Sequence, residues 1–169
     1  MTSVLRFTED SGFHSCLKTS GEFGVSKELV DRFFQPYVYL NRETIAKRDL
    51  DFAKVSRRVA EELSKFPGVA FAVSSHDLRA GAVARTPVTD AVLANFHEDR
   101  SGDIYIVQEP YWFLFDKGPI KVMHGSPWRY DTHVPVILAV PGIAPRTVHR
   151  RIQTIDVLDA PPALTLGSD

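Results

Sequence analysis

A chain of 169 residues has room for one domain of ordinary size with a substantial apolar core. Hydrophobic residues make up 44% and charged residues 24% of the chain, and the formal net charge is -1. These values are typical of a soluble globular protein. This charge balance favours no nucleic-acid partner, and no apolar segment reaches the roughly 18 residues that a membrane span requires.

The amino-terminal segment gives limited information about the compartment. Cys16 is the single cysteine, so the chain has no internal disulfide, but one thiol does not decide between compartments. Residues 1–20 lack the basic start and the continuous apolar core of a secretory signal. By default, the sequence therefore favours the cytoplasm.

The first predicted strand begins at Ser3 and runs into a polar turn at Asp10. Ligands of open α/β sheets gather beyond the carboxyl ends of strands, which is where Asp10 falls. From the sequence alone, Asp10 is either a turn-capping carboxylate or part of a ligand-binding site. A pairing with His14 at D-x-x-x-H spacing would need a helix, and Gly12 within that spacing weakens this interpretation.

The middle of the chain predicts a helix, a strand, a long helix and a second strand. Residues 25–34 have an apolar face that predicts a helix stopped by Pro36, and residues 36–40 have strand composition. Apolar residues at helical spacing predict an amphipathic helix from Phe52 to Phe66. With residues 69–73 as the next strand, this part of the chain predicts a β-α-β unit, whose strands usually lie parallel.

Further elements follow before the most distinctive stretch. Residues 74–78 predict a short turn or helix, and Thr86 caps a helix that begins at Pro87. Residues 103–108 alternate as a strand does, and an aromatic cluster follows at 109–115. Those aromatic side chains either line a pocket or, as is more usual in small cores, pack inside the domain.

The most distinctive stretch of the chain is residues 123–143, M-H-G-S-P-W-R-Y-D-T-H-V-P-V-I-L-A-V-P-G-I. A turn-rich opening at 124–127 leads to Asp131 and His133, then to an apolar run at 134–140 that Pro-Gly closes. This pattern predicts an irregular loop that presents histidine directly before a strand long enough to be buried. Loops held by rigid strands are frequent places for chemistry.

The order H-G-S-P-x-x-Y-D-T-H-V-P, followed by an apolar run, P-G-I and T-I-D-V, resembles the C-terminal half of the alkaline phosphatase superfamily. It is most similar to the type I phosphodiesterase/nucleotide pyrophosphatase-like branch of zinc phosphatases. The resemblance implies an α/β fold in which a mixed sheet has flanking helices and a β-α-β unit. It also implies one truncated domain over 1–169, with 25–115 as the family's inserted, cap-like region and 116–169 as its C-terminal metal-ligand loop and strands.

The resemblance implies zinc as the cofactor and assigns two candidate ligands. His124 matches the histidine of the family's H-G-(S/T)-P motif, which binds the first zinc, and neutral imidazole is a good zinc donor. Asp10 matches the aspartate of an Asp-His-Gly triplet, but Ser11 replaces its histidine and a hydroxyl is a poor zinc ligand. Asp131 and His133 are candidate outer partners that orient the ligand. Without the resemblance, His124 is a loop histidine and His133 a residue at the start of a strand.

The family hydrolyses phosphate mono- and diesters with two zinc ions. Its nucleophilic Thr or Ser and its earlier ligands have no counterpart here, and Asp10 and His124 belong to different zinc sites. Because a catalytic zinc needs three protein donors, we expect this chain to be inactive alone. The alternative is a non-catalytic α/β binding or oligomerisation module. An apolar face left by the missing half would favour a homo-oligomer or a partner chain. Family members are often exported, which leaves the compartment unknown.

Overall fold

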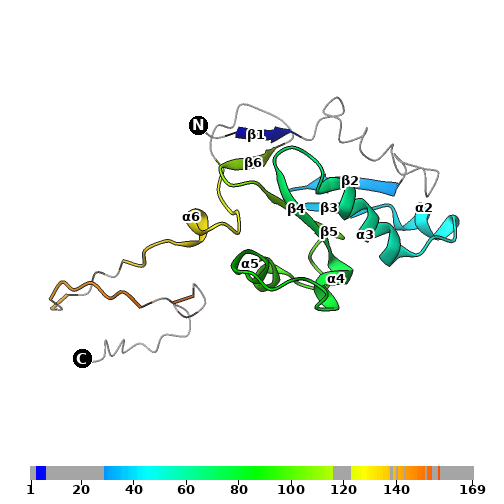
Figure 1. Ribbon diagram of the computed structural model, residues 1–169. Coiled ribbons are helices and arrows are strands. Elements are labelled where there is room, and N and C mark those ends of the chain that lie inside the picture. The colour runs from blue at the N-terminus through cyan, green and yellow to red at the C-terminus, as the bar shows by residue number, and fades with distance from the viewer. Residues whose placement is uncertain are drawn as a thin grey trace. The chain divides into compact units, whose positions relative to one another are not determined.

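The computed structural model describes residues 3–6, 29–115, 123–137, 139, 141–142, 144–150, 152–153 and 156 (Figure 1). The chain forms two compact units, Met1–Val134 and Pro135–Asp169. The described helices and strands lie in the first unit, which is where the sheet and the apolar core are found.

A four-stranded sheet forms the centre of the first unit, in the order β2-β3-β5-β4. Its strands are β2 (Val30–Phe34), β3 (Tyr37–Leu40), β4 (Val69–Ser74) and β5 (Ile104–Gln108), and each neighbouring pair is antiparallel. Because β3 and β4 both run antiparallel to β5, they run parallel to each other. The predicted β-α-β unit is therefore present in a split form, with β5 between its two strands.

Helices cover both faces of this sheet. On one face, α2 (Arg42–Lys47) and α3 (Phe52–Leu63) pack against a cluster that includes Ile104 and Ile106 of β5. On the other face, α4 (Ser75–Arg79) and α5 (Pro87–Asn95) pack with Tyr105 and Val107. Successive β5 side chains thus enter opposite layers, and all five residues of this strand are buried. The predicted mixed α/β fold with flanking helices is confirmed.

Side-chain caps set where these helices begin. Each of four polar residues accepts a hydrogen bond from a backbone N–H in the first helical turn: Asn41, Asp51, Ser74 and Thr86. Such a bond satisfies a backbone donor that has no partner inside the helix. The predicted helix starts after Asp51 and at Pro87 are confirmed.

The predicted helix over residues 25–34 is wrong for the part that the structure describes. Val30–Phe34 forms β2, which pairs with β3 across a turn at Gln35 and Pro36. Phe34, expected on an inward helical face, is 72% exposed. Pairing with β3 decides the conformation, because Val and Phe suit a strand as well as a helix and the apolar spacing of a short run does not separate the two.

A separate two-stranded sheet pairs the start of the chain with its middle. β1 (Ser3–Arg6) lies parallel to β6 (Trp112–Phe115), which confirms the first predicted strand. Phe113 and Leu114 are buried and Trp112 packs against the core. The aromatic cluster therefore contributes to the core, which was the more usual of its two interpretations.

The apolar run at 134–140 differs from its prediction as a buried strand. Its described residues have no strand assignment and are exposed, with Val134 at 64% and Ile137 at 86%. A strand needs a neighbour to satisfy its backbone groups, and in the described part of the chain no strand pairs with this run. The apolar composition of the run did not indicate whether a neighbouring strand was present to pair with it.

Among the residues described, no helix is both long and apolar enough to cross a lipid bilayer.

Candidate functional site

The candidate site is the loop from Met123 to His133, which contains the short helix α6 (Arg129–Thr132). Within it, one carboxylate oxygen of Asp131 accepts two hydrogen bonds from Ser126: one from the backbone N–H at 2.9 Å and one from the hydroxyl. Ser126 is only 5% exposed, so both donors are satisfied inside the protein. This pair closes the loop on itself across α6.

Two aromatic side chains attach the loop to the end of β5 and to the connection between β5 and β6. The Trp128 indole N–H donates to the carbonyl of Gln108, the last residue of β5, at 2.7 Å. The Tyr130 hydroxyl accepts from the backbone N–H of Tyr111 at 3.0 Å, and their rings stack with centroids 5.1 Å apart. The loop is therefore fixed at two points, at Gln108 and at Tyr111.

His124 lies at the exposed start of this loop and lines a cavity of about 400 Å³. Another part of the lining is the end of β2 and the β2–β3 turn, namely Phe33, Phe34, Gln35 and Pro36. Gln108 and the two chain neighbours of His124, Met123 and Gly125, complete the lining. Gly125 has a φ of +93°, a left-handed conformation that glycine adopts without strain. The His124 imidazole thus lines a partly apolar cavity.

The structure brings the predicted site residues together only in part. His124 and Asp131 lie in one loop, but the described carboxylate contacts of Asp131 are with Ser126. His133 is exposed and ends α6, where its backbone N–H donates to the carbonyl of Arg129 at 2.8 Å. Asp10, Ser11 and His14 lie outside the described residues.

The described residues of this loop offer one candidate metal donor, the imidazole of His124. An exposed imidazole beside a cavity is a suitable donor for zinc. A zinc ion bound by the protein needs three or four donors, and no group of three His, Cys, Asp or Glu side chains converges anywhere in the described part of the chain. No reaction step is therefore assigned to a metal held by these residues alone.

Sequence interpretation named Asp131 but missed its bond to Ser126 and the other contacts that hold the loop. Ser126 and Asp131 are five positions apart, and Ser or Asp in a turn-rich segment often bonds nearby backbone, so this pair had a local signal. Trp128 bonds a carbonyl 20 residues away, for which the sequence carries no signal. The same holds for the β2–β3 turn opposite His124.

The fold of this chain matches part of the fold of an alkaline phosphatase. Crystal structures of alkaline phosphatase PafA, one wild type and one mutant, match this chain with a TM-score of 0.59 and 24% identity. The match covers 79% of this chain and 24% of PafA. The fold of the chain is thus shared with part of a known alkaline phosphatase.

Two of the curated relatives that the chain matches are also named alkaline phosphatases. The chain is 29% identical over 140 residues to a protein of Myroides odoratus named a calcium-transporting ATPase, covering 83% of this chain and 25% of the relative. It is 27% identical over 139 residues to PafA of Elizabethkingia meningoseptica, covering 81% and 24%. It is 23% identical over 128 residues to alkaline phosphatase PhoV of Synechococcus elongatus, covering 75% and 22%. No protein-family model matches the chain.

These comparisons confirm the resemblance to the alkaline phosphatase superfamily and its partial extent. The chain spans about a quarter of the length of the curated relatives that it matches. The narrower resemblance to the phosphodiesterase and nucleotide pyrophosphatase branch stays a prediction.

Proposed function

We propose that this chain supplies one part of the active site of a zinc-dependent phosphate mono- or diester hydrolase, with His124 as a zinc ligand. The observation that carries the proposal is the position of His124: an exposed imidazole on a loop that Trp128 and Asp131 hold in place beside a cavity. Such a ligand does not have to be ordered when the metal binds, which favours binding.

Several residues have proposed roles around this ligand. Asp131 positions the loop through Ser126, which is the contact that the structure describes for its carboxylate. His133 and Asp10 stay candidates by resemblance, the first as an outer partner and the second as a ligand of a different zinc. The H-G-S-P-x-x-Y-D-T-H-V-P order also supports the proposed phosphodiesterase/nucleotide pyrophosphatase-like branch.

We also propose that the chain does not hydrolyse phosphate esters by itself. Hydrolysis of this kind uses two metal ions to activate the nucleophile and to stabilise the leaving oxygen. His124 is one donor, and a catalytic zinc needs three from protein. The other donors and the nucleophile would have to come from elsewhere in a longer polypeptide or from a partner chain.

Zinc calorimetry on the purified chain, with p-nitrophenyl phosphate and bis(p-nitrophenyl) phosphate as substrates, tests both statements. We expect weak zinc binding that His124→Ala abolishes and that His76→Ala, at another exposed histidine, leaves intact. We expect no turnover of either substrate. Zinc binding that is unchanged in His124→Ala would refute the ligand assignment, whereas turnover by the chain alone would refute its incompleteness.

The alternative function, a non-catalytic α/β binding module, has one specific observation in its favour. A larger cavity of about 600 Å³ lies beside β4, and its lining shares no residue with the cavity at His124. A surface that can bind something independently of the metal ligand is what a binding module requires.

A further inference from the structure

The cavity at His124 also contains the side-chain amide of Gln108, the last residue of β5. Gln108 is only 6% exposed. Its backbone carbonyl accepts the bond from Trp128, but its side-chain amide makes no hydrogen bond within the part of the chain that the structure describes. The amide atoms are not sealed from solvent, so they open onto the cavity that this residue lines. Buried polar side chains nearly always have a partner, so this amide is available to a ligand.

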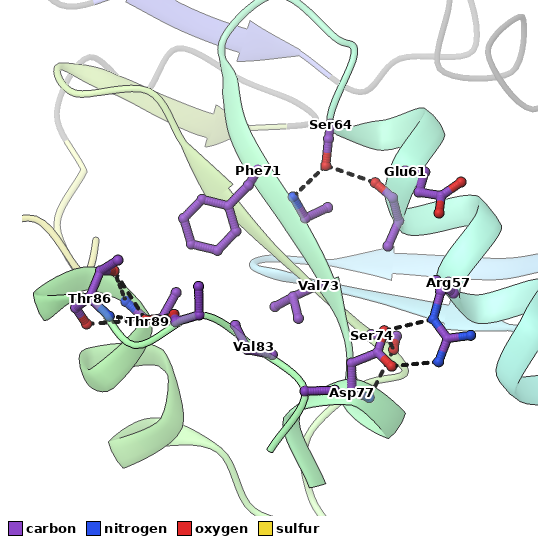
Figure 2. Close-up of a pocket in the computed structure, with 14 residues that line it drawn as sticks. Arg57, Glu61, Ser64, Phe71, Val73, Ser74, Asp77, Val83, Thr86 and Thr89 are labelled. Carbon is purple, nitrogen blue, oxygen red and sulfur yellow. Dashed lines mark hydrogen bonds and ion pairs between the residues drawn. The ribbon is translucent and has the colours of Figure 1, made fainter. Parts of the chain in front are cut away.

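The larger cavity beside β4 differs in this respect (Figure 2). Its Asp77 carboxylate binds Arg57, with 2.7 Å to Arg57 Nη2. The Ser64 hydroxyl accepts from the backbone N–H of Ala72 and donates to the carbonyl of Ala60. A ligand would have to displace these bonds before it gained new ones. The cavity with the unbonded amide is therefore the better place for a specific ligand.

The rest of the cavity at His124 is apolar or neutral. Phe33, Phe34 and Pro36 form an apolar part of the lining, and Phe34 is 72% exposed. None of the described lining residues is Lys, Arg, Asp or Glu. A charged group that enters such a space loses water and finds no opposite charge. The cavity therefore favours an uncharged group that is partly apolar and has a hydrogen-bonding edge.

We propose that Gln108 binds the alcohol part of the phosphate ester, and that this part is an uncharged aromatic group with a hydrogen-bonding substituent. A carboxamide both donates and accepts, so it matches an amide or hydroxyl on the ligand. The exposed ring of Phe34 offers an aromatic face for stacking. A volume of about 400 Å³ is of the size that small ligands occupy. The proposal rests on the proposed function, in which His124 of the same cavity serves the phosphoryl end.

The position of His124 decides between a small molecule and a segment of polypeptide. A metal ligand of a hydrolase has to stay open to the substrate. A further segment of the polypeptide, or a second copy of this chain, that filled the cavity would close the access to the imidazole. The occupant is therefore a group of the substrate.

The test titrates 4-hydroxybenzamide, the alcohol released from such an ester, into the full chain without metal. Two-dimensional NMR follows the side-chain NH₂ signals of Gln108 and the ring protons of His124. We expect both to shift with one dissociation constant on the order of 1 mM, as a ligand of about ten heavy atoms allows. 4-Hydroxybenzoate has the same shape and a negative charge, and it should bind at least about tenfold more weakly.

Three variants assign the binding to the cavity. Gln108→Met removes the carboxamide at nearly constant volume and should weaken binding about fivefold. Gln35→Met is the matched control, since Gln35 lines the same cavity but is half-buried, and the affinity should stay within about twofold because water competes for its amide. Phe34→Ser should weaken binding about threefold through the lost ring contact. The urea midpoint of Gln108→Met should not fall, because its side-chain amide has no bond within the described fold to lose.

The proposal is overturned if Gln108 shows no saturable shift, if the benzamide and the benzoate bind equally, or if both glutamine variants weaken binding equally. A lower urea midpoint for Gln108→Met would also overturn it, because the amide would then have a partner inside the fold. No zinc is present, so this result is independent of the zinc test at His124. Zinc binding that requires His124, without benzamide binding, would overturn this proposal alone. Benzamide binding without a zinc site at His124 would overturn its assignment to a phosphate ester.

Discussion

At the scale of single residues, the bond pair between Ser126 and Asp131 holds the His124 loop. Ser126 is almost fully buried, so loss of its acceptor leaves a buried N–H and a buried hydroxyl without a partner. Such a loss costs about 1–3 kcal/mol. We predict that Asp131→Ala opens the loop locally and speeds hydrogen exchange of the Ser126 amide about tenfold or more, measured by NMR.

Asp131→Asn is the matched control for that substitution. Both hydrogen bonds from Ser126 reach the same carboxylate oxygen, and the side-chain carbonyl of asparagine can accept them in its place. We expect the exchange rate of the Ser126 amide to rise only about threefold in this variant. If Asp131→Ala leaves that rate unchanged, the carboxylate does not hold the loop.

At the scale of secondary-structure elements, the turn between α3 and β4 is fitted against β6. Gly68 has a φ of +89°, and a Cβ added there would lie 2.6 Å from Trp112 Cε3. Its carbonyl accepts from the backbone N–H of Glu109 at 2.8 Å, so the turn cannot move away without losing that bond. We predict that Gly68→Ala lowers the free energy of unfolding by about 2–4 kcal/mol in urea titrations, because overpacking adds to backbone strain.

Gly81→Ala separates strain from overpacking in that experiment. Gly81 has a φ of +64°, but nothing lies within 4 Å of an added Cβ. This substitution should cost only the backbone term, about 1–2 kcal/mol. Equal losses at the two glycines would show that the contact with Trp112 contributes nothing.

The elements differ in how far the sequence determined them. Capped helices were predictable because the signal is local: Asp51 and Thr86 each bond a backbone N–H three residues further on. The conformation of Val30–Phe34 was not predictable, because this strand depends on pairing with β3 after a turn. The candidate site follows the same division. The motif predicted the loop, whereas its attachment through Trp128 and its opposite wall depend on contacts distant in sequence.

At the scale of the whole molecule, ionisable groups in the fold make stability depend on pH. A hydrogen bond from Arg57 lowers the pKa of Asp77, whose side chain is only 15% exposed, and Ser74 adds a second bond. Stability from a lowered carboxyl pKa is present above the ordinary value of 3.8 and is lost as the pH falls through the folded-state pKa.

We predict that Asp77→Asn lowers the free energy of unfolding by about 1–3 kcal/mol at neutral pH. As the pH falls from the ordinary carboxyl pKa towards the lower folded-state pKa, the gap between this variant and the natural chain should narrow, because the unfolded natural chain takes up a proton that the folded chain does not yet bind. Urea titrations at neutral and acidic pH measure the gap. Asp99→Asn, at an exposed aspartate, should show little effect at either pH, and a gap that stays constant with pH would contradict the argument.

At alkaline pH, the buried side chain of Tyr105 limits the stability of the fold. Tyr105 is 4% exposed and its ring meets that of Tyr37 edge to face, and burial raises the pKa of Tyr105 from 10.0 to about 12. Between these values the unfolded chain has released the phenol proton and the folded chain has not. The unfolded state therefore binds fewer protons, and the free energy of unfolding falls as the pH rises.

We predict that Tyr105→Phe removes this loss, which amounts to about 2–3 kcal/mol across that pH range. At neutral pH the variant should be about 1 kcal/mol less stable, because the hydrogen bond between Tyr105 and Asn95 is lost. The two stability curves should then cross as the pH rises, in urea titrations from neutral pH to pH about 12. Tyr111→Phe, at a tyrosine that is 65% exposed, should keep the slope of the natural chain. Parallel curves for Tyr105→Phe and the natural chain would show that the buried phenol does not limit alkaline stability.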